Sequence, residues 1–399
     1  NPVFADGITN PDGSYSIDLA VPAGFTEVFV GTLAFCDAVN PFISTNVTLV
    51  NGAGSADFQI CEDSFPPIND CYADMFITPV DSLTFQFTGY YYSFFDSTQQ
   101  AESYYWDFGD GYNQSDCAGH GTHVAGIIAG RTPGADPDRA DRHPEWFMGV
   151  APDAGIVSVK VADNTGATDI SQVIAGVDWV VEHADELDIR VLNLSYTSNS
   201  PLSYTADPLT YALERAWNAG LVVVVAAGND GWGAHGLASP ANDPYVIAAG
   251  AVEATSDTTF TVPSWESSGD GARNPDIAAP GAHIDSLRVP GGRVDTEHPE
   301  GFVSNTLFRG SGSSQAAAVV SGAAALLLDA RPNLTNNQVK ALLKRRTVSA
   351  TPRVSLLSGA GVIQLDEIYN IWAPAGTQSW PAAVGDGSIE AARGGVHVI

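Results

Sequence analysis

Four consecutive valines at positions 222–225 restrict the fold of this chain more than any other feature. A strand without polar alternation buries both of its faces, which is typical of the centre of a parallel sheet covered by helices on both sides. The apolar stretch around it, residues 221–227, is far shorter than the roughly 20 residues that a membrane helix needs. We therefore expect an α/β domain built around this strand, and no membrane span.

Strand-like and helix-like segments alternate along the rest of that domain. Short apolar runs predict strands near residues 156–161, 190–194, 221–226 and 245–250. Longer runs predict helices near residues 120–130, 170–184, 206–219 and 314–329, and a last helix at 335–346. In the last helix we expect Leu342 and Leu343 to point inward and the basic run at 344–346 to lie at a solvated end. The alternation predicts a parallel sheet with helices on both faces.

Charge divides the chain into two parts. Residues 1–130 contain 16 acidic residues and no Lys or Arg, so the first basic residue is Arg131. The whole chain carries 17 basic and 46 acidic residues, a formal net charge of −29. Such a surface repels phosphate backbones, so we expect no nucleic-acid partner. Strong acidity favours an extracellular protein, although a merely well-solvated surface explains it equally well.

The front of the chain has the pattern of small β-domains. Residues 11–60 alternate apolar and polar positions in short runs separated by Gly, Pro, Asn and Asp, which predicts an antiparallel β-sandwich. The segment Asp12-Gly13-Ser14-Tyr15 resembles the start of carboxypeptidase-regulatory-like modules. The chain has four cysteines, Cys36, Cys61, Cys71 and Cys117, which allow three pairings. A Cys36–Cys61 bridge fits a secreted β-domain. The cysteine spacings do not indicate a zinc site.

A second β-module is predicted over residues 72–111. Residues 84–88 alternate as a strand, and the run at 106–111 reads Trp-Asp-Phe-Gly-Asp-Gly. Trp106 and Phe108 lie on one face of a strand and the following residues form a turn. This run resembles the signature of PKD (polycystic-kidney-disease-type) domains, which are β-sandwiches appended to secreted bacterial enzymes. The closing strands of such a domain are not visible after Gly111, so we expect a truncated module.

Six sequence blocks in one order define the second half of the chain. They are residues 120–126 (His-Gly-Thr-His-Val-Ala-Gly), 149–154, 190–195, 222–230, 276–281 and 310–318. Their content and order resemble the subtilisin-like serine peptidases, or subtilases. The resemblance covers residues 116–318 and implies a subtilisin-like α/β fold and a peptide-bond hydrolase. Two histidines three residues apart are otherwise core residues or weak metal ligands.

The resemblance assigns three catalytic residues. Ser314 precedes a long apolar helix, whose N-terminus favours developing negative charge, and would be the nucleophile. His120 would act as the general base, and the Asn229 side chain would donate a hydrogen bond to the oxyanion. The alternatives are an N-cap serine for Ser314, with Ser313 also able to cap, and a plain turn residue for Asn229. His123 is expected to be a packing residue.

The same resemblance places substrate-binding residues along one strand. Leu194, Ser195, Tyr196 and Gly228 would line the cleft, where a peptide substrate pairs as an added strand. The family commonly has glycines directly after this serine, and the bulkier side chains here leave the cleavage preference open. The chemistry requires no cofactor and we expect no catalytic metal, while the acidic loops permit structural calcium.

The expected triad aspartate is missing from its usual place. It would precede Ser/Thr-Gly some tens of residues before the histidine block, and no such run occurs at residues 60–119. Asp81 and Asp96 lack the glycine, although either could act as a surrogate, and Asp116 lies too close to His120 to come from a separate strand. We interpret this as a junction between Gly111 and Asp116, with the first peptidase strand lost.

These patterns give a domain scheme and two hypotheses. The scheme is a β-sandwich module at 1–66, a partial PKD-like module at 67–114, a subtilisin-like domain at 115–372 and a tail at 373–399. The first hypothesis is a secreted or cell-surface bacterial-type serine endopeptidase acting on proteins or peptides, impaired by the missing aspartate. The second is a non-catalytic extracellular surface or adhesion protein with a vestigial peptidase domain.

Overall fold

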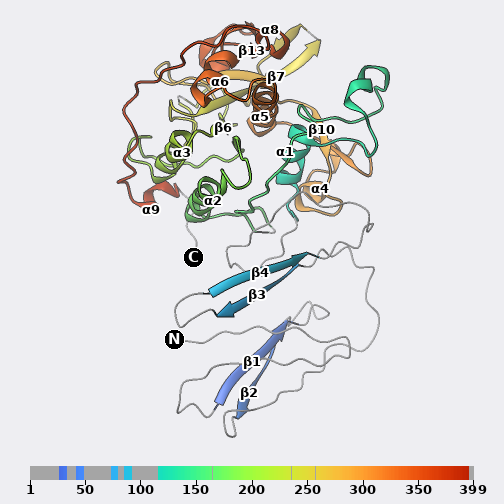
Figure 1. Cartoon of the computed structure of the whole chain (residues 1–399), viewed down its shortest axis with the longest axis vertical. Coiled ribbons are helices and arrows are strands. Elements are labelled where there is room, and N and C mark those ends of the chain that lie inside the picture. Colours follow the sequence, from blue (N-terminus) through green and yellow to red (C-terminus); the bar gives the residue numbers. More distant parts are fainter. Residues whose placement is uncertain are drawn as a thin grey trace. The chain divides into compact units, whose positions relative to one another are not determined.

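The computed structural model describes residues 116–394, except positions 164, 235 and 257, together with four strands closer to the start of the chain. The chain divides into two compact units, Asn1–Phe94 and Phe95–Ile399. In the first unit, β1 (Glu27–Leu33) pairs antiparallel with β2 (Phe42–Thr48), and β3 (Ala73–Pro79) pairs antiparallel with β4 (Phe85–Tyr91). Figure 1 shows these two hairpins in blue.

These hairpins agree with the predicted β-character of the front, where short strands were expected within residues 11–60 and at 84–88. The two resemblances that named the modules rest on residues 12–15 and 106–111, which lie outside the described residues. The Cys36–Cys61 bridge also lies outside them. The module identities and the domain boundaries in this region therefore stay predictions.

The second unit is built on a mostly parallel sheet. Its strands follow the order β12 (Thr347–Val348), β13 (Val362–Ile363), β9 (Ile277–Pro280), β7 (Ile247–Ser256), β6 (Val222–Ala226) and β5 (Val191–Leu194). All neighbours are parallel except β12 and β13, and β8 (Thr259–Thr261) adds an antiparallel pairing to β7. A separate antiparallel pair consists of β10 (Ile284–Leu287) and β11 (Leu307–Gly310). Every residue of β6 is buried, which confirms the central position that its valines predict.

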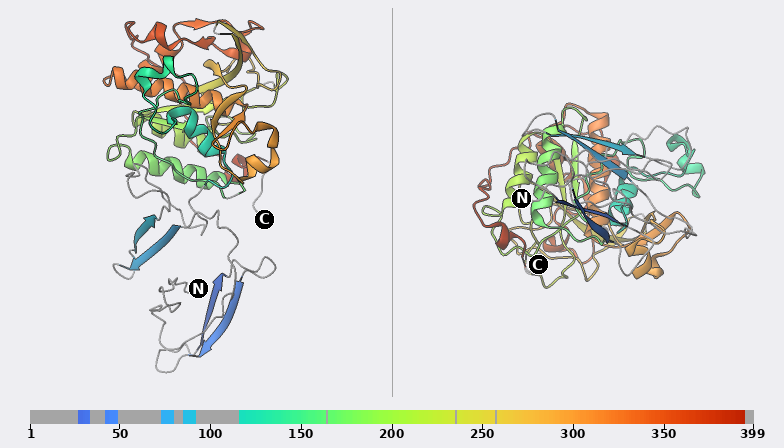
Figure 2. Two further views of the ribbon diagram at one scale, coloured as in Figure 1. Left: turned by 90° about the vertical axis from the view of Figure 1, so that its right-hand side faces the viewer. Right: turned by 90° about the horizontal axis from the view of Figure 1, so that it is seen from below.

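Helices cover the sheet on two sides, as predicted. One group is α1 (His120–Ala129) and α5 (Ser313–Ala330), and the other is α2 (Ile170–His183) and α3 (Pro208–Asn218). Figures 1 and 2 show these groups on opposite sides of β6 and β7. The further helices are α4 (Arg293–Glu297), α6 (Asn336–Leu343), α7 (Ser355–Ser358), α8 (Leu365–Ile368) and α9 (Ile389–Ala392), with 3-10 turns η1 (Pro137–Arg142) and η2 (Pro299–Gly301).

Local capping explains where the helices begin. Asp169 and Thr335 each form a capping box, at the starts of α2 and α6. Their side chains accept a backbone N–H from the first turn, and their own backbone N–H groups donate to the side-chain oxygen of a glutamine three residues later. Asp207 caps α3, with a proline directly after it. In α6, Leu342 and Leu343 are fully buried, while residues 344–346 are exposed, as predicted.

The predicted strand at 156–161 is wrong. These residues are half-buried, and Val157, Val159 and Val161 pack against the core, but they join no strand among the described residues. A strand requires a hydrogen-bonded neighbour as well as alternation. On this side the sheet ends at β5, whose described pairing is with β6 alone. The alternation of apolar and polar residues therefore predicted the buried side chains correctly. The strand pairing that we expected from it was wrong.

Helix α5 passes through the middle of the fold. Of the described residues it alone forms a helix that is long and apolar enough to cross a membrane, with a mean hydropathy of 1.3. However, 67% of it is buried in the protein, against β5, β6, β7, β9 and α1. Length and composition are satisfied equally by the core helix of a globular domain, and the packing identifies α5 as one.

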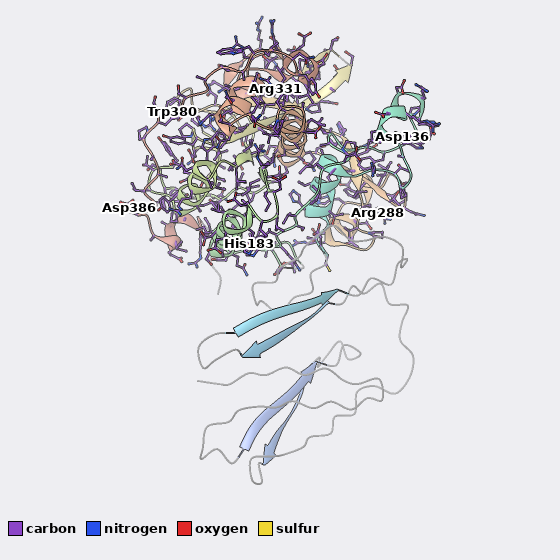
Figure 3. The ribbon with its side chains drawn as sticks, viewed as in Figure 1. Asp136, His183, Arg288, Arg331, Trp380 and Asp386 are labelled. Carbon is purple, nitrogen blue, oxygen red and sulfur yellow. The ribbon has the colours of Figure 1, made fainter. Side chains whose placement is uncertain are left out.

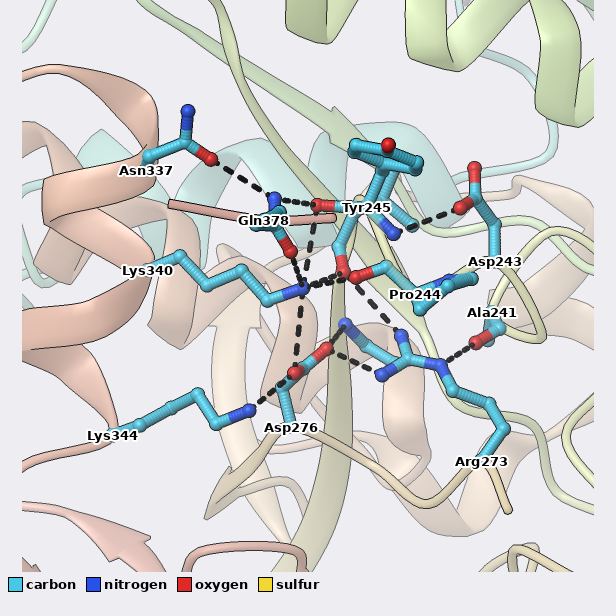
Figure 4. A network of polar contacts seen from close by, with 12 residues as sticks. Ala241, Asp243, Pro244, Tyr245, Arg273, Asp276, Asn337, Lys340, Lys344 and Gln378 are labelled. Carbon is cyan, nitrogen blue, oxygen red and sulfur yellow. Dashed lines mark hydrogen bonds and ion pairs between the residues drawn. The ribbon is translucent and has the colours of Figure 1, made fainter. Parts of the chain in front are cut away.

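A buried charge cluster fastens the loop before β9 to α6 (Figure 4). The Asp276 carboxylate accepts hydrogen bonds from Lys344 Nζ at 2.7 Å, from Arg273 Nη1 at 2.9 Å and from the Ala248 N–H at 3.1 Å. Lys340 Nζ lies 3.4 Å from the same carboxylate. Burial alone would raise the pKa of Asp276, but the three cations hold it well below its usual range.

Lys340 is itself buried, and its ammonium group also donates to backbone carbonyl oxygens and to the Gln378 side chain. Its Nζ donates to the carbonyl oxygens of Pro244 at 2.6 Å and Val246 at 2.9 Å. Burial lowers the pKa of Lys340 to about 8, although Asp276 raises it. The cluster, which we name the Asp276 cluster, consists of Asp276, Arg273, Lys340 and Lys344.

Candidate active site

Ser314 lies in the first turn of α5. The helix begins after Gly312, so Ser313 does not cap it, and the capping role that we considered for Ser313 is wrong. The Ser313 hydroxyl instead accepts the Gly228 N–H at 3.0 Å. Ser314 is half-buried, and within the described part of the chain its own N–H has no acceptor. A free N–H at a helix N-terminus is suited to a developing negative charge.

Asn229 is exposed at the end of the buried strand β6 and is tied to the start of α5. Its Oδ1 accepts the Ser313 N–H at 2.9 Å. This hydrogen bond uses the carboxamide oxygen, and Nδ2 has no hydrogen-bond acceptor among the described residues. Nδ2 therefore remains available as a donor next to Ser314.

Gly228 makes this connection sterically possible. Its φ of +117° lies in the left-handed region that favours glycine. A methyl group built on it would lie 2.7 Å from the Ser267 Oγ. The turn from β6 to Asn229 therefore requires glycine at this position.

His120 is the first residue of α1, and it is accessible to solvent although the protein around its ring desolvates it in part. Desolvation by the surrounding protein lowers the pKa of His120 below its ordinary value, while the Asp116 carboxylate raises it. Asp116 makes no described hydrogen bond to the ring, and its oxygens accept the Gly119 N–H at 2.8 Å and the Thr122 N–H at 2.5 Å. Asp116 instead holds the N-terminal turn of α1.

No carboxylate hydrogen-bonds to His120 within residues 116–394 as described. The two surrogates that the sequence offered, Asp81 and Asp96, lie outside the described residues, so their role stays a prediction. The structure describes no hydrogen bond between His120 and Ser314. What it establishes is that the helices bearing them, α1 and α5, pack against each other.

His123, one turn further along α1, is buried and packs edge-on against Phe308. This is the packing position predicted for it. Neither ring nitrogen has a hydrogen-bond partner in the part of the chain that the structure describes. Burial lowers the pKa of His123 to about 4, which keeps the ring neutral.

His123 and Gln315, the residue after Ser314, approach the same point at Gly310. A methyl group built on Gly310 would lie 2.7 Å from Gln315 Nε2 and 2.9 Å from His123 Nε2. One built on Gly312 would lie 2.9 Å from Gln315 Oε1 and 3.5 Å from Asn229 Nδ2. The Gln315 carboxamide therefore lies between the second turn of α1 and the Asn229 side chain.

The predicted substrate strand lies beside Ser314. The Ser195 hydroxyl donates to the Ser314 carbonyl oxygen at 3.0 Å, which joins the end of β5 to α5. Asn193, which sequence reasoning missed, donates from Nδ2 to Ser195 Oγ at 3.0 Å and accepts the Ser321 hydroxyl at 2.9 Å. Positions 193 and 195 of a strand share a face, which is the signal that could have found it.

The structure thus brings Ser314, Ser195, Gly228 and Asn229 together through short hydrogen bonds. Leu194 and Tyr196 are half-buried and pack against the main core on either side of Ser195. The described residues contain no group of three or more His, Cys, Asp or Glu that could hold a metal. Structural calcium stays a prediction, because calcium also binds backbone and amide oxygens.

Comparison with known proteins identifies the family. The model of the subtilase family matches residues 38–361, which is more than half of the chain. The chain belongs to the subtilase family. The matched span begins within the front unit, in the region where we predicted separate β-modules.

Individual relatives give the same result. The chain is 36% identical to "Serine protease AprX" of Bacillus subtilis (strain 168) over 275 residues, 65% of this chain and 60% of that protein. It is 35% identical to "Subtilisin E" of the same organism over 56% of this chain and 49% of that protein. The chain therefore spans about half to three fifths of these two relatives.

Solved structures support the fold. "Sphericase" superposes with a TM-score of 0.51 at 26% identity, covering 63% of this chain and 79% of that one. Fervidolysin from Fervidobacterium pennivorans, described as a keratinolytic enzyme related to subtilisin, superposes with a TM-score of 0.51 at 27% identity. That match covers 66% of this chain and 37% of that one.

Proposed function

We propose that this chain is a serine endopeptidase that hydrolyses peptide bonds in proteins or peptides. The Ser314 hydroxyl attacks the scissile carbonyl carbon while His120 takes its proton, and His120 later returns that proton to the leaving amine. The oxyanion that forms receives hydrogen bonds from Asn229 Nδ2 and the Ser314 N–H. Ser195 and Tyr196 line the position where the substrate backbone pairs with the end of β5.

The hydrogen bond from the Ser313 N–H to Asn229 Oδ1 carries this proposal. It fixes a side-chain donor and a helix N-terminus beside one serine, which is the arrangement that stabilises a tetrahedral oxyanion. A serine that only capped a helix, or an asparagine that only formed a turn, would not require this connection across 84 residues of sequence.

Turnover by this chain is proposed to be impaired. In serine peptidases of this type the triad aspartate holds the histidine in the correct tautomer and stabilises its protonated form. Asp116, the acid nearest to His120 in sequence, is already engaged by two backbone N–H groups. Loss of that aspartate alone costs about 10⁴-fold in turnover in subtilisin, so we expect slow chemistry at an assembled site.

We further propose that the protein acts outside the cell or at its surface. The net charge of −29 and the β-rich, Cys-containing front part support this placement. No cofactor enters the proposed mechanism.

Labelling with a fluorophosphonate probe tests the proposal, since the probe reacts only with an activated serine. We expect slow labelling of the full chain that disappears in Ser314→Ala. Ser256→Ala, which removes an exposed hydroxyl on β7, is the matched control and should label like the parent chain. Absence of labelling in parent protein that unfolds cooperatively would refute the proposal in favour of the non-catalytic surface protein.

A further inference from the structure

The C-terminal segment 376–394 is folded onto the domain, although its Gly- and Ala-rich sequence showed no motif. It runs along the outside of α3 from α8 to α9, and Figure 3 labels Trp380 and Asp386 within it. Near its start, the Gln378 side chain accepts a hydrogen bond from Lys340 Nζ at 3.2 Å and donates to the Tyr245 carbonyl oxygen at 3.1 Å. The segment is therefore anchored to the Asp276 cluster at this end.

Its middle part is hydrogen-bonded to the loop that follows the predicted substrate strand. The Val384 N–H donates to the Thr205 carbonyl oxygen at 2.7 Å, and the Gly387 N–H donates to the Ala206 carbonyl oxygen at 2.8 Å. The Tyr204 hydroxyl donates to the Pro381 carbonyl oxygen at 3.0 Å. Three consecutive residues of the loop, 204–206, are thus bound to the segment.

The far end of the segment is fixed by an arginine. Arg393 Nε donates to Asp169 Oδ2 at 2.5 Å and Arg393 Nη2 donates to Asp169 Oδ1 at 3.3 Å, a two-point contact in which the side chains are 25% and 13% exposed. Asp169 also caps α2, so the pair ties the segment to a rigid element. Partial burial makes this contact stronger than an ordinary surface ion pair.

This end lies against the residues that follow Tyr196. A methyl group built on Gly394 would lie 2.7 Å from the Asn199 carbonyl carbon, and Gly394 has a φ of +70°. The backbone there is therefore packed directly on the loop, with no room for a side chain.

From inside the domain the described contacts hold mainly the two ends of the loop. The Ser198 N–H donates to the Ser239 carbonyl oxygen at 2.7 Å. At the other end Asp207 is bound by the Tyr211 N–H at 3.1 Å and the Ser239 hydroxyl at 2.9 Å, while Thr210 Oγ1 donates to the Tyr204 carbonyl oxygen at 2.5 Å.

We infer that the segment 376–394 holds the loop 196–207 in place as the outer support of the substrate cleft, and that Arg393 is a positioning residue for substrate binding. The inference rests on the proposed function, because that function makes residues 195 and 196 part of the cleft. Arg393 does not touch the reacting atoms. Its loss should weaken the binding of a peptide and leave the chemical step at Ser314 unchanged.

Two measurements on the full chain test this role, with Arg393→Ala and Arg393→Lys as variants. Amide hydrogen exchange should become about tenfold faster over residues 196–207 in Arg393→Ala, with a smaller change in Arg393→Lys, which keeps the charge but not the two-point contact. Exchange over β6 should not change. The matched control is Arg131→Ala, which breaks the exposed Arg131–Asp153 pair far along the chain from both segments.

The second measurement separates binding from chemistry. We expect KM for a peptide substrate to rise about tenfold in Arg393→Ala while kcat stays the same. Unchanged exchange over 196–207 would overturn the inference, as would an equal acceleration over β6, because the pair would then serve the whole fold. If the parent chain neither labels nor cleaves, the proposed function fails, and the exchange measurement still decides whether the segment supports the loop.

Discussion

The Asp276 cluster and the site around Ser314 differ in whether their polar groups have hydrogen-bond partners. In the cluster, a carboxylate that is 3% exposed receives hydrogen bonds from lysine, arginine and a backbone N–H, and the buried lysine beside it is fully satisfied. Around Ser314, the described residues leave the Asn229 Nδ2, the Ser314 N–H and both nitrogens of His123 without protein partners.

This difference indicates that the cluster contributes to the stability of the fold and that the site contributes to the reaction. Removing one partner of a buried ion pair strongly lowers the free energy of unfolding, because the other charge is then left buried without compensation. Donors left unpaired at a helix N-terminus contribute nothing to folding and are available to charge that appears during a reaction. Changes in the cluster should therefore alter the free energy of unfolding, and changes in the site should alter the rate.

The largest expected effect is on the cluster. Asp276→Asn removes the carboxylate that accepts hydrogen bonds from Arg273 and Lys344 and lies 3.4 Å from Lys340, and it leaves excess buried positive charge, so we expect a loss of about 3–5 kcal/mol in the free energy of unfolding. Denaturant unfolding at neutral pH measures this. Asp153→Asn, at an exposed ion pair, should change the same quantity by less than about 0.5 kcal/mol. Equal losses in the two variants would show that the cluster has no special role.

The next effect is on the site. Asn229→Ala should slow labelling of Ser314 by about 10²–10³-fold, the loss known for this kind of donor in a subtilisin. Asn229→Asp is the sharper variant, since it keeps the acceptor for the Ser313 N–H but removes the donor. If Asn229→Asp labelled at the parent rate, Asn229 would act by positioning Ser313 and not through the oxyanion.

His123 shares one property with each region. It is buried, as the cluster residues are, and its ring nitrogens have no described hydrogen-bond partner, as in the site. Its pKa is about 4 in the folded protein and 6.5 as an ordinary value, so the unfolded chain binds a proton that the folded chain does not between these limits. Stability should therefore fall as pH drops from about 6.5 to about 4, by about 3 kcal/mol from this residue.

Unfolding of the parent chain and of His123→Gln across this pH range isolates that contribution. The difference in unfolding free energy between the two proteins should grow with pH from about 4 to about 6.5 and be constant above. A constant difference throughout would show that His123 finds a partner when protonated.

The smallest expected effect is a shift in the pH dependence of labelling. His120 must be neutral to accept the Ser314 proton, and desolvation lowers its pKa from 6.5. The acid limb of the labelling rate should therefore have its midpoint below pH 6.5. A midpoint above 6.5 would indicate that a carboxylate pairs with His120 and raises its pKa, which would restore the missing member of the triad.

Sequence patterns predicted the elements that local chemistry determines. The valines of β6, the apolar face of α6 and the first turn of α5 follow from burial and helix propensity. Residues 156–161 show the limit of this reasoning, since alternation reports which side chains are buried and says nothing about a neighbouring strand.

Contacts between distant residues were not predictable in the same way. Lys340 looked like any lysine on an amphipathic helix, and its burial depends on carbonyl groups almost 100 residues earlier. The contacts between loop 196–207 and residues 376–394 are largely backbone hydrogen bonds, which carry no sequence signal. The motif blocks identified Ser314 and Asn229, but the bond that joins them through Ser313 required the structure.

The central claim is that His120 and Ser314 form a working pair whose contribution is to rate and not to stability. Labelling rate and unfolding free energy measured on one preparation of His120→Ala test it most directly. Because His120 is accessible to solvent, we expect the labelling rate to fall at least about 10²-fold, with a change of less than about 0.5 kcal/mol in unfolding. Labelling at the parent rate, or a loss of stability without a loss of rate, would contradict the account.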